Sequence, residues 1–249
     1  MGQKTVVITG GTHGIGLDIT RAFVNAGYFV VIGARRPSST LDQFGQLVTY
    51  VQCDAKEEPA HQMLVDVALS ETGTLDVYVN NVGYSEWRSI ENIDAKFLGD
   101  IFQTNVHSIF WGCKIASAAM KTSGSIINIS SIAGKRGSAN NSAYCATKFG
   151  VNGITQSLAK ELGPKGIRVN ALCPVLIPTA GLIEALRDPA SPANGDSEIF
   201  FSEFAQANSA LNRLPAGHEV AEFCLFLASP AASAVTGQCI NVDCGVFPQ

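Results

Sequence analysis

A tyrosine and a lysine one helical turn apart are the residues of this sequence best suited to chemistry. Tyr144 and Lys148 occupy positions i and i+4, so a helix would project both side chains from one face. A phenol ordinarily has a pKa of about 10, and a nearby positive charge favours the phenolate, so we expect Lys148 to lower the pKa of Tyr144 toward neutrality. Ser131 follows the β-branched run 126–129, which places its hydroxyl at the end of a predicted strand. Together these groups suit proton transfer to or from a substrate oxygen.

The same pair also has an ordinary structural interpretation. On an amphipathic helix, a tyrosine often half-buries its ring while a lysine extends its apolar stem along the surface. Apolar residues at helical spacing do continue after the pair, namely Phe149, Val151, Ile154, Leu158 and Leu162. The pair by itself therefore does not establish catalysis, and the N-terminal part of the chain decides between the two interpretations.

A glycine-rich segment, Thr9 to Gly16, lies between the first predicted strand and the first predicted helix. It reads Thr-Gly-Gly-Thr-His-Gly-Ile-Gly and follows the apolar run 5–9. In this setting glycines permit a tight turn and a close approach of the main chain to a pyrophosphate, which the positive end of the helix dipole attracts. The segment predicts a dinucleotide-binding loop.

The end of the second predicted strand favours the phosphorylated dinucleotide, NADP. An NAD site usually has Asp or Glu there, whose carboxylate binds the ribose hydroxyls and repels a 2′-phosphate. Here Arg35 and Arg36 follow the apolar residues 31–34. A guanidinium presents a planar fork to phosphate oxygens, so we expect Arg35 to bind the 2′-phosphate, with Arg36, Ser38 and His13 as neighbours. The alternative is that the two arginines are merely solvated on a loop.

Composition excludes several other functions. The 249 residues have a formal net charge of -4, which argues against nucleic-acid and membrane partners. No apolar run approaches the length of a membrane span, and the strand expected at 5–9 leaves no room for a signal peptide. The seven cysteines are dispersed without a Cys-x-x-Cys pair, which indicates reduced thiols rather than disulfides or a metal site. A cytoplasmic protein is expected.

Apolar runs alternate with helical patterns along the chain, as in an α/β protein. The predicted strands are 5–9, 28–33, 47–52, 75–79, 125–129, 168–171 and 238–242. Continuous apolar strands fit a parallel sheet covered on both faces, and right-handed crossovers make it a doubly wound, Rossmann-type sheet of about seven strands. Residues 1–249 are expected to form a single domain. Residues 174–215, rich in turn residues and with an amphipathic piece at 199–204, are predicted to form a substrate loop or lid.

With these residues in view, the chain resembles the short-chain dehydrogenase/reductase family over nearly its full length. The resemblance is to the short, single-domain branch that includes the 3-oxoacyl-carrier-protein reductases. The loop from Thr9 to Gly16 is similar to the family's cofactor loop, Asp54 to its adenine-binding acid, and residues 80–83 to its Asn-Asn-Ala-Gly signature. Residues 174–179 are similar to the segment that contacts the nicotinamide. The cofactor contacts implied in this way, together with the residues near the phosphate, are Gly10, Thr12, His13, Gly14, Ile15, Gly16, Arg35, Arg36, Asp54, Ala55, Asn81, Val82, Gly83, Tyr144, Lys148, Pro174, Ile177 and Thr179.

The resemblance also implies a mechanism with four catalytic residues. Tyr144 would be the acid in ketone reduction and the base in alcohol oxidation, and Lys148 would lower its pKa and bind the nicotinamide ribose. Ser131 would hold the carbonyl oxygen, and Asn105 would support a water that connects Lys148 to solvent. The implied activity is NADP(H)-dependent interconversion of a ketone and a secondary alcohol. The substrate would be a 3-oxoacyl thioester or a natural-product ketone, free or carrier-bound, and the implied assembly is a homotetramer or homodimer.

Two other functions are weighed against this one. A sugar epimerase or dehydratase of the family's longer branch fits the glycine spacing and the short C-terminal half less well. An NADP-sensing binding protein without turnover usually lacks the tyrosine or the lysine, and both are present here.

Three residues depart from the family pattern. Val82 replaces a usual Ala, which would crowd the ribose side of the site, and Val175 replaces a usual Gly, which would narrow the pocket or tilt the nicotinamide. Cys244 replaces a usual Gly near the C-terminus, in a region that the family uses for subunit packing. These changes affect expectations about substrate and assembly and leave the catalytic groups in place.

Other side chains have both functional and structural interpretations. One group of side chains would frame an apolar or aromatic substrate or would simply pack the lid: Tyr84, Trp87, Arg88, Phe200, Phe201 and Phe204. Lys135 and Arg136 would meet an acidic carrier or a carboxylated substrate, or would be solvated. His61, His107 and His218 do not stand at a spacing typical of ligands, either with one another or with acidic residues, so they are expected to be structural. Cys145 is expected to lie in the core.

Overall fold

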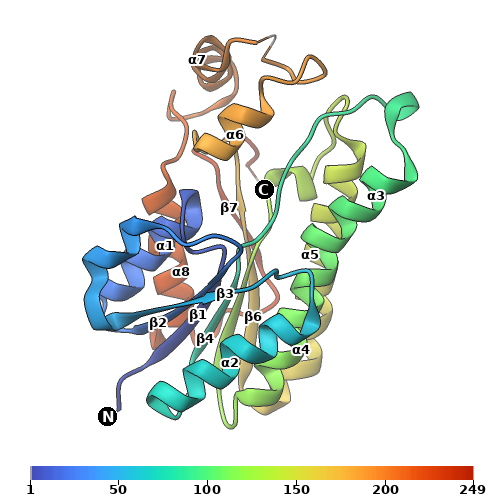
Figure 1. The fold of residues 1–249 in the computed structure, drawn as a ribbon. Coiled ribbons are helices and arrows are strands. Elements are labelled where there is room, and N and C mark those ends of the chain that lie inside the picture. Colours follow the sequence, from blue (N-terminus) through green and yellow to red (C-terminus); the bar gives the residue numbers. More distant parts are fainter. Residues whose placement is uncertain (1, 194, 249) are drawn as a thin grey trace.

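The computed structural model describes residues 2–193 and 195–248, and a parallel sheet runs through the middle of this part of the chain (Figure 1). Its seven strands have the order β3-β2-β1-β4-β5-β6-β7, and every neighbouring pair is parallel. The strands are β1 (Thr5–Thr9), β2 (Phe29–Ala34), β3 (Val48–Gln52), β4 (Val77–Asn80), β5 (Gly124–Ile129), β6 (Ile167–Pro174) and β7 (Cys239–Val242). The predicted doubly wound α/β architecture is confirmed.

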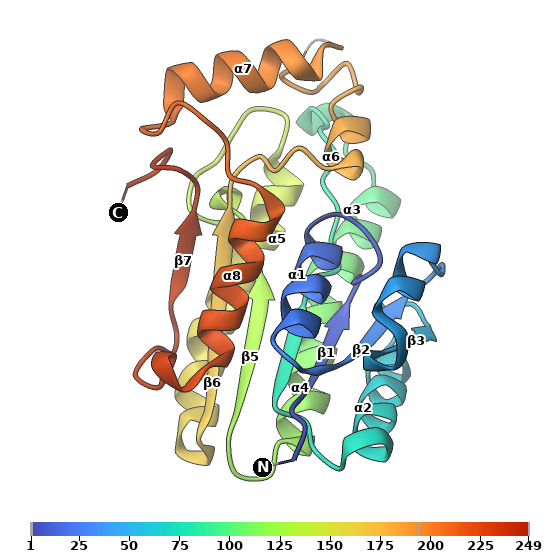
Figure 2. The same ribbon diagram turned by 90° about the vertical axis from the view of Figure 1, so that its left-hand side faces the viewer.

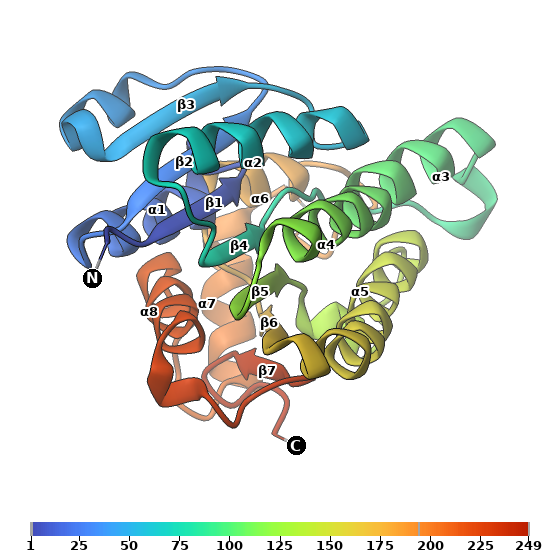
Figure 3. The same cartoon turned by 90° about the horizontal axis from the view of Figure 1, so that it is seen from below.

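Helices cover both faces of the sheet (Figure 3). On one face α1 (Gly14–Asn25) and α8 (Gly217–Ala228) pack against the strands, and their buried side chains share one apolar core. On the other face, a second core includes side chains of α2 (Glu58–Thr72), α4 (Ser108–Ala119) and α5 (Ser142–Leu162). Because β1, β2 and β4 are buried on both faces, they read as continuous apolar runs rather than alternating ones.

The pattern of residues from 95 to about 121 predicts one long helix, and in the structure a π-helical turn divides it. The structure has α3 (Ala95–Phe102), the π-turn η3 (Gln103–His107) and then α4. Apolar periodicity does not register a single widened turn, which is why the sequence predicted one helix. Single π-turns inside helices are often found at functional sites, and this one contains the buried Asn105.

The segment between β6 and α8 crosses the carboxyl ends of the strands (Figure 2). It contains α6 (Ala180–Ala185) and α7 (Ser197–Asn208). Strand β6 is longer than expected because it pairs with β5 on one side and β7 on the other, up to the pair Pro174 and Val242. The remaining short turns are η1 (Ser39–Leu47), η2 (Ile90–Asn92), η4 (Ile132–Gly134), η5 (Gly163–Lys165) and η6 (Pro230–Ala232).

None of the helices formed by residues 2–193 and 195–248 has both the length and the apolar character needed to cross a membrane.

Candidate active site

Tyr144, Lys148 and Ser131 line one cavity of about 910 Å³. Helix α5 begins at Ser142 and places Tyr144 and Lys148 one turn apart, as predicted. Ser131 directly follows the end of β5 and precedes the short turn η4. The trio therefore lies at the carboxyl ends of the strands, which is where open α/β sheets bind their ligands.

Ser131 is held with its hydroxyl proton available. Its Oγ accepts a hydrogen bond from the Ala133 main-chain nitrogen at 3.1 Å, which fixes the side chain and leaves the O–H free to donate. A hydrogen bond with the Ser131 side chain favours the phenolate form of Tyr144 and so acts to lower the pKa of the phenol. The serine is thus placed where it can act on the same oxygen as the tyrosine.

Lys148 is buried, with 4% of its surface exposed. Its Nζ donates to the main-chain oxygen of Ile129 at 2.8 Å and lies 5.6 Å from the centre of the Tyr144 ring. A Cβ on Gly83 would lie 3.5 Å from this Nζ and 3.3 Å from Asn105 Oδ1, so a glycine here leaves the ammonium accessible from the cavity. Helix α5 and the end of β5 therefore fix the position of the charge, and the loop after β4 leaves it open to the cavity.

The pKa values of the pair differ from the expectation. Burial raises the pKa of Tyr144 to about 12, although the hydrogen bond with Ser131 opposes this, and burial lowers the pKa of Lys148 to about 8. The predicted near-neutral phenol is therefore wrong for the protein's own groups. The sequence places the lysine one turn from the tyrosine, but it does not reveal that Lys148 is buried and Tyr144 partly buried. Removal from water disfavours the charged form of each group.

Asn105 supports the site from behind the cavity wall. Its side chain is fully buried, its Nδ2 donates to Tyr84 O at 2.9 Å and to Thr147 Oγ1 at 3.2 Å, and its Oδ1 accepts from Tyr84 N at 3.0 Å. Both Nδ2 hydrogens are thus used within the protein. Asn105 therefore connects the loop after β4, through Tyr84, to helix α5, through Thr147.

The glycine loop requires glycine at several positions for steric reasons. Gly10 and Gly14 have φ values of 71° and 53°, in the left-handed region that favours glycine. A Cβ on Gly16 would lie 2.1 Å from the main-chain oxygen of Gly10, so helix α1 could not approach the loop with any other residue there. The side chain of Asn81 donates to Thr9 O and Gly10 O at 3.0 and 3.1 Å. This closely packed turn at the start of α1 fits a pyrophosphate.

The buried His61 supports the cavity wall formed by the loop after β3. His61 accepts a hydrogen bond from the Tyr78 hydroxyl at 2.6 Å, and its other ring nitrogen donates to Ala55 O at 2.8 Å. Asp54 pairs with Lys56 at 3.7 Å in the same turn. The structural interpretation of His61 holds, and the histidine also anchors the loop expected to meet adenine. Sequence reasoning missed this role because the partners are seventeen and six positions away.

Sixteen of the eighteen predicted cofactor residues line this cavity: Gly10, His13, Gly14, Ile15, Gly16, Arg35, Asp54, Ala55, Asn81, Val82, Gly83, Tyr144, Lys148, Pro174, Ile177 and Thr179. The other two, Thr12 and Arg36, are not among its lining residues. Thr12 is buried and its Oγ1 lies 2.9 Å from His13 Nδ1, whereas Arg36 is exposed on the loop. Val175 lines the cavity but packs into a small core with Ile132.

The aromatic set divides between cavity wall and packing. Tyr84, Trp87, Phe200 and Phe204 line the cavity, whereas Phe201 packs behind it in the cluster that contains Trp87 and Leu186. Packing therefore explains Phe201, and binding of an apolar substrate by the other four stays a prediction.

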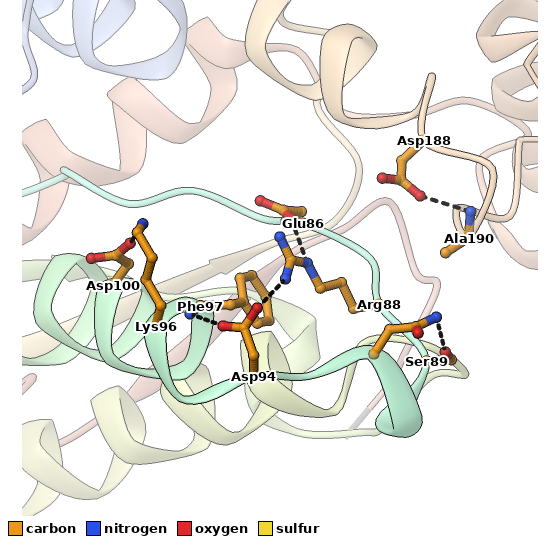
Figure 4. A network of polar contacts seen from close by, with 10 residues as sticks. Glu86, Arg88, Ser89, Asp94, Lys96, Phe97, Asp100, Asp188 and Ala190 are labelled. Carbon is orange, nitrogen blue, oxygen red and sulfur yellow. Dashed lines mark hydrogen bonds and ion pairs between the residues drawn. The ribbon is translucent and has the colours of Figure 1, made fainter.

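Arg88 lies outside the cavity lining, in a polar network of its own (Figure 4). Its guanidinium pairs with Glu86 at 2.7 Å and Asp94 at 3.6 Å and lies 4.1 Å from the centre of the Phe97 ring. The suggestion that Arg88 frames the substrate is therefore wrong, because acids two and six positions away neutralise its charge.

Comparison with known proteins agrees with the fold. Residues 10–247 match the family described as Enoyl-(Acyl carrier protein) reductase. The chain is 33% identical over 253 residues to the 3-oxoacyl-[acyl-carrier-protein] reductase FabG of Chlamydia trachomatis, covering 98% of this chain and 97% of that protein. It is 34% identical over 255 residues to a 3alpha-hydroxysteroid dehydrogenase of Mediterraneibacter gnavus, with 97% and 96% covered. A crystal structure of a single-residue variant of actinorhodin polyketide ketoreductase with NADPH superimposes with a TM-score of 0.91 at 30% identity, covering 98% of this chain and 97% of the other.

These similarities define the class of protein: an oxidoreductase that acts on a ketone or the corresponding alcohol with a nicotinamide dinucleotide. The chain belongs to the short-chain dehydrogenase/reductase family.

Proposed function

We propose that this enzyme reduces a ketone to a secondary alcohol with NADPH, with Tyr144 as the proton donor. The observation that carries the proposal is that the Ser131–Tyr144–Lys148 trio and the glycine loop line the same cavity. The residues present fit a dinucleotide: the loop around Gly10 and Gly16 suits a pyrophosphate, and Asp54 and Ala55 line the wall toward β3. When bound, the cofactor supplies hydride to the substrate carbon.

Side chains of the protein supply the proton that the substrate oxygen takes up. Ser131 donates a hydrogen bond to the carbonyl oxygen, because its Oγ is already fixed by Ala133 N and its O–H is available. Tyr144 stays protonated at neutral pH because burial raises its pKa to about 12. An alkoxide is a much stronger base than a phenolate, so transfer of the proton from Tyr144 to the reduced oxygen is downhill. The buried ammonium of Lys148 then stabilises the phenolate that is left.

The preference for NADP rests on Arg35. Its exposed guanidinium lines the cavity just after β2, where no carboxylate is present to repel a 2′-phosphate. An Arg35→Ala variant should lose about 10- to 100-fold in kcat/KM with NADPH while its kcat/KM with NADH changes little, as expected for a charge-assisted contact. Arg36→Ala, in the neighbouring exposed residue outside the cavity lining, is the matched control. A wild-type enzyme that prefers NADH would contradict the assignment.

Assays with a broad ketone panel test the activity itself. NADPH oxidation followed by absorbance should depend on the ketone and yield the secondary alcohol. The substrate class that we favour, a 3-oxoacyl thioester or a natural-product ketone, belongs in the panel. The alternative, an NADP-sensing protein, predicts tight NADPH binding without consumption for every ketone.

We also propose that the enzyme forms a homotetramer or homodimer through the outer sides of α4 and α5. Phe110 on α4 and Phe149 on α5 are 47% and 49% exposed, so both helices offer a large apolar side chain that a second copy of the chain would cover. Sedimentation velocity should give a mass above that of one chain, and a Phe110→Asp/Phe149→Asp double variant should lower it. A monomeric wild-type protein would refute this part.

A cytoplasmic location is supported by the thiols. All seven cysteines are free and lie among the described residues, as expected in a reducing compartment.

A further inference from the structure

The substrate end of the cavity contains one arginine that the proposed mechanism does not use. Arg136 lines the cavity together with residues 137–139 of the loop after η4, five positions beyond Ser131. Its guanidinium lies 5.7 Å from the centre of the Phe247 ring, which follows β7. In the described part of the chain, no carboxylate lies within ion-pair distance of Arg136.

The other charged side chains of this cavity are accounted for. Asp54 pairs with Lys56 and Asp100 pairs with Lys96. Lys148 belongs to the proposed catalytic trio, and Arg35 lies at the end of β2, where we place the cofactor phosphate. Arg88, the other arginine near the aromatic wall, is neutralised by Glu86 and Asp94 (Figure 4). The positive charge of Arg136 thus stands without a counterion among the described residues.

Sheet order keeps Arg136 away from the phosphates of the cofactor. Phe247, against which the guanidinium lies, follows β7 at one edge of the sheet, whereas the glycine loop follows β1 and Arg35 follows β2. Four interstrand steps separate β1 from β7, which at about 4.8 Å each amounts to roughly 19 Å. Arg136 therefore faces the part of the cavity beyond the trio, on the side away from the dinucleotide loop.

Large apolar side chains form much of the remaining wall of that part. Trp87, Leu182, Phe200 and Phe204 line it, contributed by the loop after β4 and by α6 and α7. A ligand that fits has an apolar body against these side chains and an anionic group at the guanidinium, which presents parallel N–H donors to a carboxylate. Resting on the function proposed above, we infer that the substrate is an oxo acid: an apolar ketone with a free carboxylate that Arg136 binds.

Matched pairs of ketones test this inference. We would measure kcat/KM with NADPH for aryl oxo acids of increasing length between ketone and carboxylate, each beside its methyl ester. At the best length the wild-type enzyme should prefer the acid by about 10- to 100-fold, the range for a charge-assisted hydrogen bond. Arg136→Gln should abolish this preference while leaving the kcat/KM of the ester nearly unchanged, and Arg136→Lys should restore part of it.

Controls distinguish a specificity role from a structural one. Arg187, which is exposed just after α6 and pairs with Glu184, is outside the cavity lining, so Arg187→Gln should keep the preference for the acid. Equal loss for acid and ester in Arg136→Gln, with a lowered melting temperature, would mean that the arginine only supports the fold. Equal turnover of acid and ester by the wild type, or a preference for the ester, would overturn the inference and leave the proposed reductase intact. No turnover of any ketone with either nicotinamide would overturn both.

Discussion

The two ends of the active-site cavity are built in different ways. At the dinucleotide end, the main chain is closely packed: the Asn81 side chain donates to Thr9 O and Gly10 O, and Gly16 packs against Gly10 O where no side chain would fit. At the substrate end, side chains of α6, α7 and the loop after β4 form small apolar clusters of their own, apart from the two large cores.

We infer from this difference that the dinucleotide end serves the reaction itself and the substrate end determines which substrate is bound. The dinucleotide end is part of the sheet and cannot change without disturbing it, whereas the α6–α7 segment can vary with little effect on the strands beneath. The trio lies between them and takes Ser131 from the end of β5 and Tyr144 and Lys148 from α5. We therefore expect substitutions at the two ends to affect different measurements.

The largest effect is expected from Tyr144→Phe, because Tyr144 lies between the two ends of the cavity and is the proposed proton donor. Loss of the phenolic proton should lower kcat by about 10²- to 10⁴-fold, the usual contribution of a positioned acid. The NADPH Kd, measured by fluorescence titration, should stay close to that of the wild type because the glycine loop is untouched. The matched control is Tyr84→Phe, which also removes a hydroxyl from the cavity wall and should retain most activity. Turnover near the wild-type level in Tyr144→Phe would refute the assigned role.

Two glycine-to-alanine substitutions compare the ends directly. In Gly16→Ala the new Cβ would lie 2.1 Å from Gly10 O, so the loop must shift at a cost of about 1–3 kcal/mol, seen as weaker NADPH binding and a lower melting temperature. In Gly181→Ala, on α6, the Cβ has no atom within 4 Å, and alanine should stabilise the helix by up to about 1 kcal/mol. Calorimetry and NADPH titration of both variants test the comparison. Equal losses of NADPH affinity would mean that the two ends are not independent.

The pH dependence of reduction should report the charge of Lys148. Burial lowers the pKa of Lys148 to about 8 and raises that of Tyr144 to about 12. As pH rises above about 8, the enzyme therefore loses the ammonium while the phenol keeps its proton. If the ammonium is needed, kcat/KM for ketone reduction should be level below about pH 8 and fall about 10-fold by about pH 9. A profile that stays level up to about pH 10 would exclude a role for the lysine charge in free enzyme.

Stability should change in the opposite direction over part of this range. An unfolded chain leaves the lysine at its ordinary pKa of about 10.4, so between about pH 8 and 10 the unfolded state holds more protons. The contribution of Lys148 to the free energy of unfolding should therefore rise with pH in this window. Loss of activity there cannot then be assigned to loss of folding caused by Lys148.

Sequence reasoning succeeded where local pattern is sufficient. The strand–glycine–helix arrangement at Thr9 to Gly16 and the i, i+4 spacing of Tyr144 and Lys148 need no tertiary information. It failed where neighbours distant in the chain decide. The pKa of Tyr144 depends on burial, and the side chain of Asn105 in the π-turn finds its partners in Tyr84 and Thr147, 21 and 42 positions away. Only the tertiary structure shows that Arg136 has no carboxylate within ion-pair distance among the described residues. It also places the guanidinium beside Phe247, 111 positions away.

The smallest effect that we predict concerns a residue that anchors the substrate end. Cys244 has a φ of 54°, in the left-handed region, and its main-chain oxygen accepts from Leu211 N and Ser209 Oγ just after α7. For a residue with a Cβ this conformation costs about 1–2 kcal/mol, which explains the glycine usual at this position of the family pattern.

Cys244→Gly should raise the free energy of unfolding by up to about 1 kcal/mol, because relief of the strained φ is partly offset by the greater chain entropy of glycine in the unfolded state. Cys244→Ala keeps the Cβ and removes the thiol, so it should not be stabilised. Urea unfolding measures both variants, and titration with NADPH should show no change in either, since the dinucleotide end is distant. If alanine stabilises the protein as much as glycine does, the thiol and not the backbone conformation is responsible.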